Sequence, residues 1–315
     1  MAKNSFDPVG TLSIGNVVTT ATILYRSNFK RYLQVSLRAT AWLVALGVAA
    51  LVFGVIGALL FGITKSWLVF IPVGLGGIGV TLYLIAKYST DRAVICRLAY
   101  QQLIDAPETV ADATRQLTPR TWAFLRLSLL LGLYMFLITF GAYIAFALTL
   151  FIIAGIFGVL SQGNLGTFAY IIIVVLGIGL GVLAIALVLR FYAYWFVSEL
   201  PLALESTSTS SLASFGLRRS RQLSSTAVRQ IILIITVAFL ITIPLSMISS
   251  IPSFIGQAMT LSTTQSVIAT GGFLVFISFI LNIAIELFVM PFWQIIKAIV
   301  YFDLRNRREG GDLIV

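Results

Sequence analysis

Long apolar runs dominate the 315-residue chain and are separated by short polar segments. A helix needs ~20 apolar residues to cross the hydrocarbon of a bilayer, and each of four uncharged runs is at least that long. These runs are 39–64, 66–86, 127–189 and 230–285.

The two longest runs must fold back on themselves. Turn-forming residues interrupt them at 161–167 (SQGNLGT) and within 249–266. The pattern therefore predicts six membrane-spanning helices, at 39–63, 67–88, 127–159, 168–196, 231–248 and 268–290.

A shorter segment with helical periodicity precedes the first span. Apolar residues recur there at three- and four-residue spacing, and Ser13 is placed to cap the start of a helix. We expect this segment to lie on the membrane surface, with its apolar side in the lipid. The residues of the apolar side are Ile14, Val17, Val18, Ala21, Leu24, Tyr25, Phe29 and Tyr32.

Basic residues are confined to one side of the predicted topology. Of the 21 Lys and Arg residues, only Lys65 lies in the three connections 64–66, 161–167 and 249–267. Because basic residues remain on the cytoplasmic side, both termini and both long connections are predicted to be cytoplasmic. The formal charge of +10 is thus a one-sided field that attracts anionic lipids of the inner leaflet.

Three short motifs indicate a repeat. TRQL (114–117) and SRQL (220–223) each precede a span, and YRSNF (25–29) is a weaker copy before the first one. We predict an all-α polytopic membrane protein, a six-helix transmembrane bundle. It would consist of three tandem units, each an amphipathic inner-surface helix plus a transmembrane hairpin. The units are approximately 12–96, 97–205 and 206–315, within a single integral membrane domain, 1–315.

Composition agrees with this class and argues against catalysis. The chain is 59% apolar and 10% charged, with a mean hydropathy of +1.03, which is not the composition of a soluble domain. Cys96 is the only cysteine and there is no histidine, so the commonest general base and metal ligand is missing. We expect no enzyme activity, no metal, no cofactor and no nucleic-acid partner.

One glycine-rich motif has a literal match to a nucleotide-binding fingerprint. GLGGIG (74–79) fits GxGxxG, but that fingerprint requires a preceding strand, and here the motif lies inside a predicted span. We interpret these glycines, and the pair Gly177 and Gly181, as sites of close helix packing.

Glu286 is the one acid inside the predicted spans, and an acid at membrane depth suggests a functional site. Asn282 and Lys297 fall on the same helix face, although Pro291 lies between. Two interpretations stay open. Glu286 either makes a structural ion pair or hydrogen bond, for which Arg126 and Arg190 are candidate partners, or is linked to proton or substrate movement.

The remaining acids lie outside the spans. We expect Asp91, Asp105, Glu108 and Asp112 to be solvated. The tail has more charge than a membrane anchor needs, and we predict docking, either on the inner connections of this chain or on a partner. The docking residues would be Asp303, Arg305, Arg307, Arg308, Glu309 and Asp312.

Three stretches resemble a known family. They are LSIGNVVTTATILYRSNFKRYL (12–33), RSRQL (219–223), and the close from Pro291 to Leu313 with IIKAIVYFDLRNRREGGDL. The chain resembles, over nearly its whole length, the six-span bacterial membrane domain that precedes some glycerophosphodiester phosphodiesterases, and its stand-alone relatives. The resemblance implies the bacterial inner membrane, with another energy-coupling membrane left open. The family's phosphodiesterase activity resides in a separate soluble domain and uses histidines, which this chain lacks.

Three hypotheses of function follow. The leading one is a non-catalytic membrane organiser or accessory subunit whose cytoplasmic face binds protein or anionic lipid, in an oligomeric state that the sequence leaves open. The second is a transporter or channel for small solutes or ions that uses Glu286. The third is an enzyme acting on lipid headgroups.

Overall fold

The computed structural model describes residues 14–160, 167–205, 212–261 and 265–309. Within these residues the chain is helical, with no strand. The helices are α1 (Ile14–Ser27), α2 (Phe29–Thr64), η1 (Trp67–Val69), α3 (Phe70–Leu103), α4 (Val110–Leu117), η2 (Thr118–Arg120), α5 (Thr121–Leu160), α6 (Thr167–Trp195), α7 (Glu199–Leu204), α8 (Leu212–Ser224), α9 (Val228–Thr260) and α10 (Gln265–Glu309).

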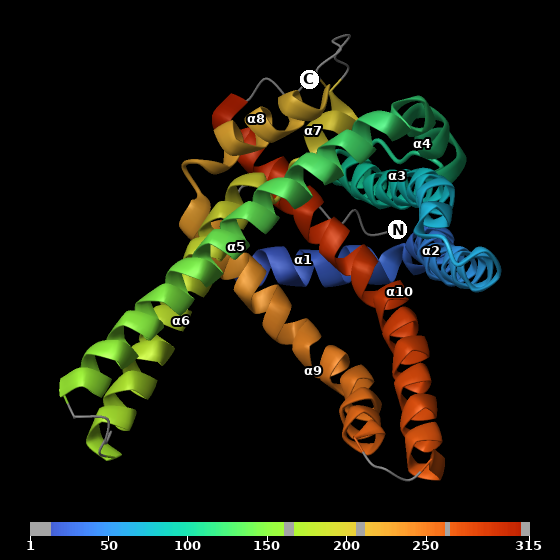
Figure 1. The fold of residues 1–315 in the computed structure, drawn as a ribbon. Coiled ribbons are helices and arrows are strands. Elements are labelled where there is room, and N and C mark those ends of the chain that lie inside the picture. Colours follow the sequence, from blue (N-terminus) through green and yellow to red (C-terminus); the bar gives the residue numbers. More distant parts are fainter. Residues whose placement is uncertain (1–13, 161–166, 206–211, 262–264, 310–315) are drawn as a thin grey trace.

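Six of these helices are long and apolar enough to cross a membrane, which confirms the predicted number of spans. They form three hairpins, α2–α3, α5–α6 and α9–α10 (Figure 1). The first hairpin turns tightly at Lys65, whose φ of 54° is left-handed, and the Ser66 side chain then accepts from the Leu68 N–H. The length and composition of these helices are those of an integral membrane protein.

The helices extend beyond the predicted spans. The break expected within 249–266 is confirmed, since α9 ends at Thr260 and α10 begins at Gln265. The predicted end of the fifth span at 248 was too early, because α9 continues with Pro244 and Pro252 inside it. Proline is tolerated in membrane helices where neighbouring groups bond the carbonyls that it frees, and serines surround both prolines here. Between the two prolines, Ser250 donates to the Ser246 carbonyl of its own helix (2.8 Å).

Shorter helices precede each hairpin along the chain: α1 before the first, α4 before the second, and α7 and α8 before the third. Arg26, Arg115 and Arg221, from the three sequence motifs, each lie in the last turn of α1, α4 or α8. Helix α1 buries Val17, Ala21 and Leu24. It ends at Ser27, so Phe29 and Tyr32 belong to α2 instead of the first helix. That the three segments repeat one unit stays a prediction.

The hairpins come together at one end of the molecule and diverge toward the other (Figure 1). We call the first end the core end; there α4, α7 and α8 lie against the ends of α3, α5 and α10. We call the far ends of the six long helices, at which the two helices of each hairpin follow one another in the chain, the tips. Large side chains are fully buried at the core end, among them Tyr32, Ile95, Phe124, Phe196, Leu200, Leu223, Ile231 and Tyr301. By contrast, at most 28% of the most apolar stretch of any long helix is buried.

Candidate functional site

A buried carboxylate lies at the centre of the core end. Glu199, the first residue of α7, accepts from Arg92 of α3 (Nη2 to Oε1, 3.2 Å) and from Lys297 of α10 (Nζ to Oε2, 3.3 Å). Glu199 is 9% exposed and Lys297 5%. These ion pairs join helices from all three parts of the chain.

The neighbours of Glu199 complete its hydrogen bonding. With the Gln294 amide oriented to match its surroundings, its nitrogen donates to Glu199 Oε2 (3.1 Å) and its oxygen accepts from Arg92 Nε (2.9 Å). The Cys96 thiol, fully buried, lies 3.6 Å from the Gln294 carbonyl oxygen. Two cations surround one carboxylate, so this cluster carries a formal surplus of one positive charge. We call Arg92, Cys96, Glu199, Gln294 and Lys297 the Glu199 cluster.

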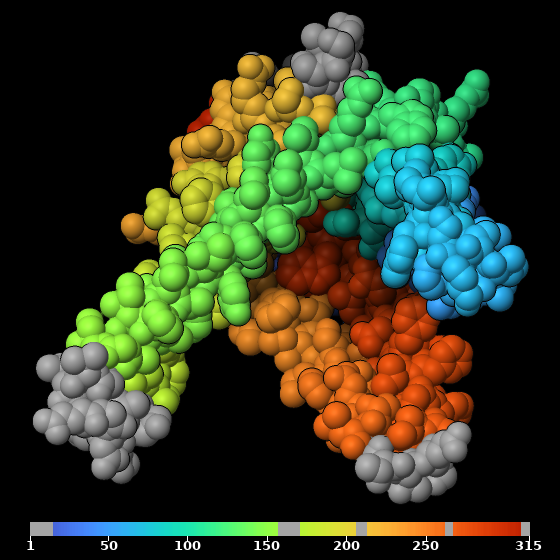
Figure 2. Space-filling view, viewed as in Figure 1, coloured from blue at the N-terminus to red at the C-terminus, as the bar shows by residue number. Residues whose placement is uncertain are grey.

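A cavity of about 710 Å³ begins at this cluster and extends between the hairpins. Figure 2 shows the molecule hollowed between the α5–α6 and α9–α10 hairpins, with α10 at the back of the hollow. Its polar lining comes from Tyr88, Arg92, Tyr192, Thr236, Thr242, Ser246, Glu286, Gln294 and Lys297. Its apolar lining is formed by Ile185, Leu189, Ile235, Phe239, Val289, Met290 and Trp293.

Glu286 lines this cavity together with Lys297, but the two do not pair. Eleven residues of helix separate them, which is ~16 Å at 1.5 Å per residue. The contact of Glu286 within the described chain is the Tyr88 hydroxyl, which donates to Oε1 (3.3 Å). The carboxylate thus faces the cavity with no cation bonded to it among the described residues.

The other predicted members of the intramembrane site lie elsewhere. Arg126 on α5 and Arg190 on α6 are exposed and do not line the cavity, so neither is the partner of Glu286 in the described chain.

Asn282 belongs to the contact between α9 and α10. Its amide nitrogen donates to the Ser278 carbonyl (2.9 Å), and its oxygen accepts from the Ser249 hydroxyl (3.0 Å). Ser278 in turn donates to the Ser249 carbonyl. Hydrogen bonds of this kind hold membrane helices together, and we assign Asn282 a packing role.

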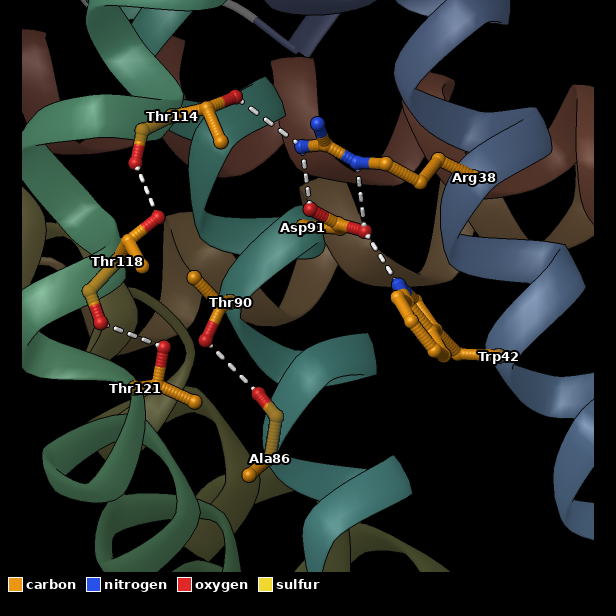
Figure 3. A network of polar contacts seen from close by, with 8 residues as sticks. All are labelled: Arg38, Trp42, Ala86, Thr90, Asp91, Thr114, Thr118 and Thr121. Carbon is orange, nitrogen blue, oxygen red and sulfur yellow. Dashed lines mark hydrogen bonds and ion pairs between the residues drawn. The ribbon is translucent and has the colours of Figure 1, made fainter.

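A second polar cluster joins the first hairpin to α4 (Figure 3). Arg38 of α2 donates through Nε to Asp91 of α3 (3.0 Å), and the Trp42 indole donates to the same carboxylate (3.0 Å). Arg38 also donates to Thr114 of α4 (3.1 Å). Asp91 is 5% exposed, so the expectation that it is solvated was wrong. Arg38 and Trp42 enclose it from a neighbouring helix.

Hydroxyl groups near this cluster bond within their own segments. Thr90 donates to the Ala86 carbonyl (2.8 Å), Thr118 to that of Thr114 and Thr121 to that of Thr118 (Figure 3). Glu108 was also expected to be solvated but is paired with Arg97 (2.7 Å). These contacts are structural.

The charged tail contacts its own chain. Glu309 pairs with Arg305 one turn earlier (2.7 Å) and with Arg219 of α8. Asp303 pairs with Arg307 (2.6 Å), and Arg308 donates to Ser225 (2.8 Å). Asp312 lies outside the described residues. The contacts of Glu309 and Arg308 with other parts of the chain support docking of the tail within the molecule. Docking on a partner stays a prediction.

Among the described residues, no group of three or more His, Cys, Asp or Glu is placed to hold a metal. GLGGIG lies within α3, where a side chain on Gly76 would meet the Phe53 ring at 3.3 Å. Comparison with protein-family models, curated proteins and solved structures finds no match. The resemblance to the phosphodiesterase-associated membrane domain accordingly stays a prediction.

Sequence reasoning missed Arg92, Glu199, Gln294 and Tyr88. Arg92 and Glu199 each follow closely after a predicted span, where a charge is usually taken to reach the headgroups. One signal was present: Glu199 begins the segment ELPLAL, where an isolated acid stands among apolar residues. Its partners lie about a hundred residues away on either side and have no local pattern.

Proposed function

We propose that the protein is a non-catalytic membrane organiser or accessory subunit that accommodates lipid between its three hairpins. The observation behind this proposal is the cavity of about 710 Å³, which has charged groups at the core end, apolar side chains along α6, and both apolar side chains and hydroxyl groups along α9. An amphipathic molecule could fill such a space inside a bilayer, and lipid is the most abundant amphipathic molecule there.

The proposed orientation places the core end in the cytoplasm of a bacterial cell. Support comes from the basic residues, which lie toward the core end while the first tip carries only Lys65. Exposed cations at the core end would attract anionic headgroups of the inner leaflet, each worth roughly 1 kcal/mol when well placed. These cations include Arg26, Lys30, Arg31, Arg115, Arg218, Arg221 and Arg229.

The three-unit arrangement is part of this proposal. Three copies of a short helix plus hairpin would place their hairpins around a common centre, and the cavity would be that centre. The matching positions of Arg26, Arg115 and Arg221 support this interpretation. A protein partner would bind at the core end, where the charged tail and α8 meet.

Native mass spectrometry of the protein released from bilayers tests the lipid proposal. We expect wild-type protein to retain lipid, and Leu189→Trp, which fills the cavity, to retain less. Leu187→Trp is the matched control, because Leu187 is 44% exposed on the same helix and does not line the cavity. Equal lipid retention by all three proteins, or none by the wild type, would contradict the proposal.

A second candidate is passage of a solute or ion through the cavity, with Glu286 on the path. The observation that favours it is that Glu286 and Lys297 line one cavity. Liposomes containing the protein would then show a flux that Glu286→Gln abolishes. The absence of flux for protons, common cations and small zwitterionic solutes would remove this candidate.

A further inference from the structure

Two charged side chains that line the cavity, Arg92 and Glu286, can each form further hydrogen bonds. Arg92 uses Nε and Nη2 for Gln294 and Glu199, and Nη1 has no hydrogen-bond partner among the described residues. Its side chain is 28% exposed, compared with 6% for Lys297. Arg92 is therefore the accessible donor of the Glu199 cluster, and its guanidinium suits a phosphate.

Glu286 supplies the opposite charge. It accepts from the Tyr88 hydroxyl, and no ion pair reaches it in the described chain. Tyr88 stands between the two poles: Arg92 Cζ lies 5.6 Å from the centre of its ring, while its hydroxyl bonds Glu286. The cation and the carboxylate are thus held apart on either side of one aromatic side chain.

The charges at the cavity balance once Glu199 is included. Arg92, Lys297 and Glu286 line the cavity. Glu199 does not line it but pairs with both cations, so two cations are matched by two carboxylates. A ligand with a net charge would leave an uncompensated charge in a medium of low dielectric constant, which is costly. A ligand that carries one positive and one negative group would satisfy both poles and leave the sum at zero.

The rest of the lining indicates what is attached to such a headgroup. Ile185 and Leu189 of α6 and Phe239 of α9 continue from the polar end toward the diverging hairpins. Ile185 and Phe239 are 62% and 57% exposed, so this surface is open to the space between the helices. Thr242 and Ser246 of α9 also line the cavity, but their hydroxyls donate to carbonyls of their own helix (3.2 and 3.3 Å). The surface can therefore accommodate acyl chains.

We propose that the cavity is a binding site for a zwitterionic phospholipid with a primary ammonium group. Its phosphate accepts from Arg92, its ammonium donates to Glu286, and its acyl chains lie against α6 and α9. A quaternary ammonium has no N–H to donate to the carboxylate, so the site favours ethanolamine over choline headgroups. The inference rests on the proposed function and gives it a ligand class.

The test uses the full chain in nanodiscs that contain equal parts of phosphatidylethanolamine, phosphatidylcholine and phosphatidylglycerol. Native mass spectrometry then reads which lipid stays bound after release. We expect phosphatidylethanolamine to be retained in preference to both others. Glu286→Gln removes the carboxylate charge but keeps an acceptor for Tyr88, and should lower that preference about tenfold, the loss of one charge-assisted hydrogen bond.

Arg190→Gln is the matched control, because Arg190 is exposed on α6 outside the cavity. It should leave the lipid preference as in the wild type. Soluble phosphoethanolamine, added in excess, should not displace the lipid, because it lacks the acyl chains; if it does, the ligand is the free zwitterion.

The outcomes separate the two proposals. If no lipid is retained, the proposed function fails. If lipid is retained but phosphatidylglycerol predominates, or Glu286→Gln leaves the preference unchanged, the zwitterionic site is wrong while lipid accommodation stands. Thermal unfolding of both variants in detergent shows that any change in preference arises in folded protein.

Discussion

The core end and the hairpin tips of this protein differ in how far their side chains are buried. At the core end, charged and apolar side chains from distant parts of the chain are buried together, as in the Glu199 cluster. Away from the core end, large apolar residues such as Phe254 (72% exposed) and Val182 (62%) are largely uncovered by protein. The same chain is thus tightly packed at one end and open at the other.

The difference reflects the solvent of each end. Lipid chains are as apolar as leucine, so a helix in the bilayer gains little from burying an apolar face against another helix. Close approach and hydrogen bonds decide contacts there, as where Asn282 bonds Ser249 of α9. At the core end water is near, and burial of apolar surface contributes to stability in the usual way. The hairpins are consequently held at the core end.

The largest expected effect is at the Glu199 cluster. Glu199→Gln leaves Arg92 and Lys297 buried without a counter-charge, and breaking a buried ion pair from one side costs ~3–5 kcal/mol. We expect a loss of this size in the free energy of unfolding, measured by titration with sodium dodecyl sulfate in mixed micelles.

Glu286→Gln is the control for that experiment, since Glu286 has a hydrogen bond to Tyr88 but no ion pair in the described residues. It should change the free energy of unfolding by less than about 1 kcal/mol, because the amide still accepts that hydrogen bond. If Glu199→Gln lowered the free energy of unfolding by no more than Glu286→Gln does, the core end would not depend on the Glu199 ion pairs.

Truncation of two isoleucines of α9 allows a direct comparison of packing toward the two ends. Ile234 and Ile241 are seven residues apart and lie on nearly the same helix face, but Ile234 is fully buried and Ile241 is 47% exposed. Truncation of a buried isoleucine costs ~2–5 kcal/mol, so Ile234→Ala should be strongly destabilising. Ile241→Ala should be close to neutral in lipid, where acyl chains replace the lost contacts. Similar losses for both, in the same unfolding titration, would mean that the hairpins are closed in the membrane.

A smaller effect is expected at the close contact between α9 and α10, the two helices of the third hairpin. A side chain on Gly256 of α9 would place its Cβ 2.5 Å from the Gly271 carbonyl oxygen of α10. Because that atom is backbone, Gly256→Ala must push the helices apart, which we expect to cost ~1–3 kcal/mol. Gly272→Ala meets nothing within 4 Å and is the control. It should be neutral or slightly stabilising, as helical glycine is replaced by alanine.

Much of the fold could be predicted from the sequence, because membrane spans depend on local composition. The six long helices and the helix that begins at Ile14 follow from runs and periods within one segment. The helix ends were harder to place, as α9 shows by continuing through Pro252. Proline and serine resemble a turn in sequence, but inside a membrane an unfolded backbone is too costly for the helix to stop.

The candidate site was predicted only in part. Glu286 and Lys297 do line one cavity, because both lie on a single helix whose period fixes their relative direction. Arg92 and Glu199 could not be found, since their pairing joins residues far apart in the chain. Asp91 was misjudged for the same reason: Arg38 and Trp42, which enclose it, come from another helix.

Cryo-electron microscopy of the protein in a lipid nanodisc is the most direct test of the central claim, that the hairpins diverge around a lipid-binding cavity. We predict elongated density that begins between Arg92 and Glu286 and runs along Leu189 and Phe239 toward the tips. A structure in which α6 packs directly on α9 along this length, with no lipid beside Glu286, would contradict the claim.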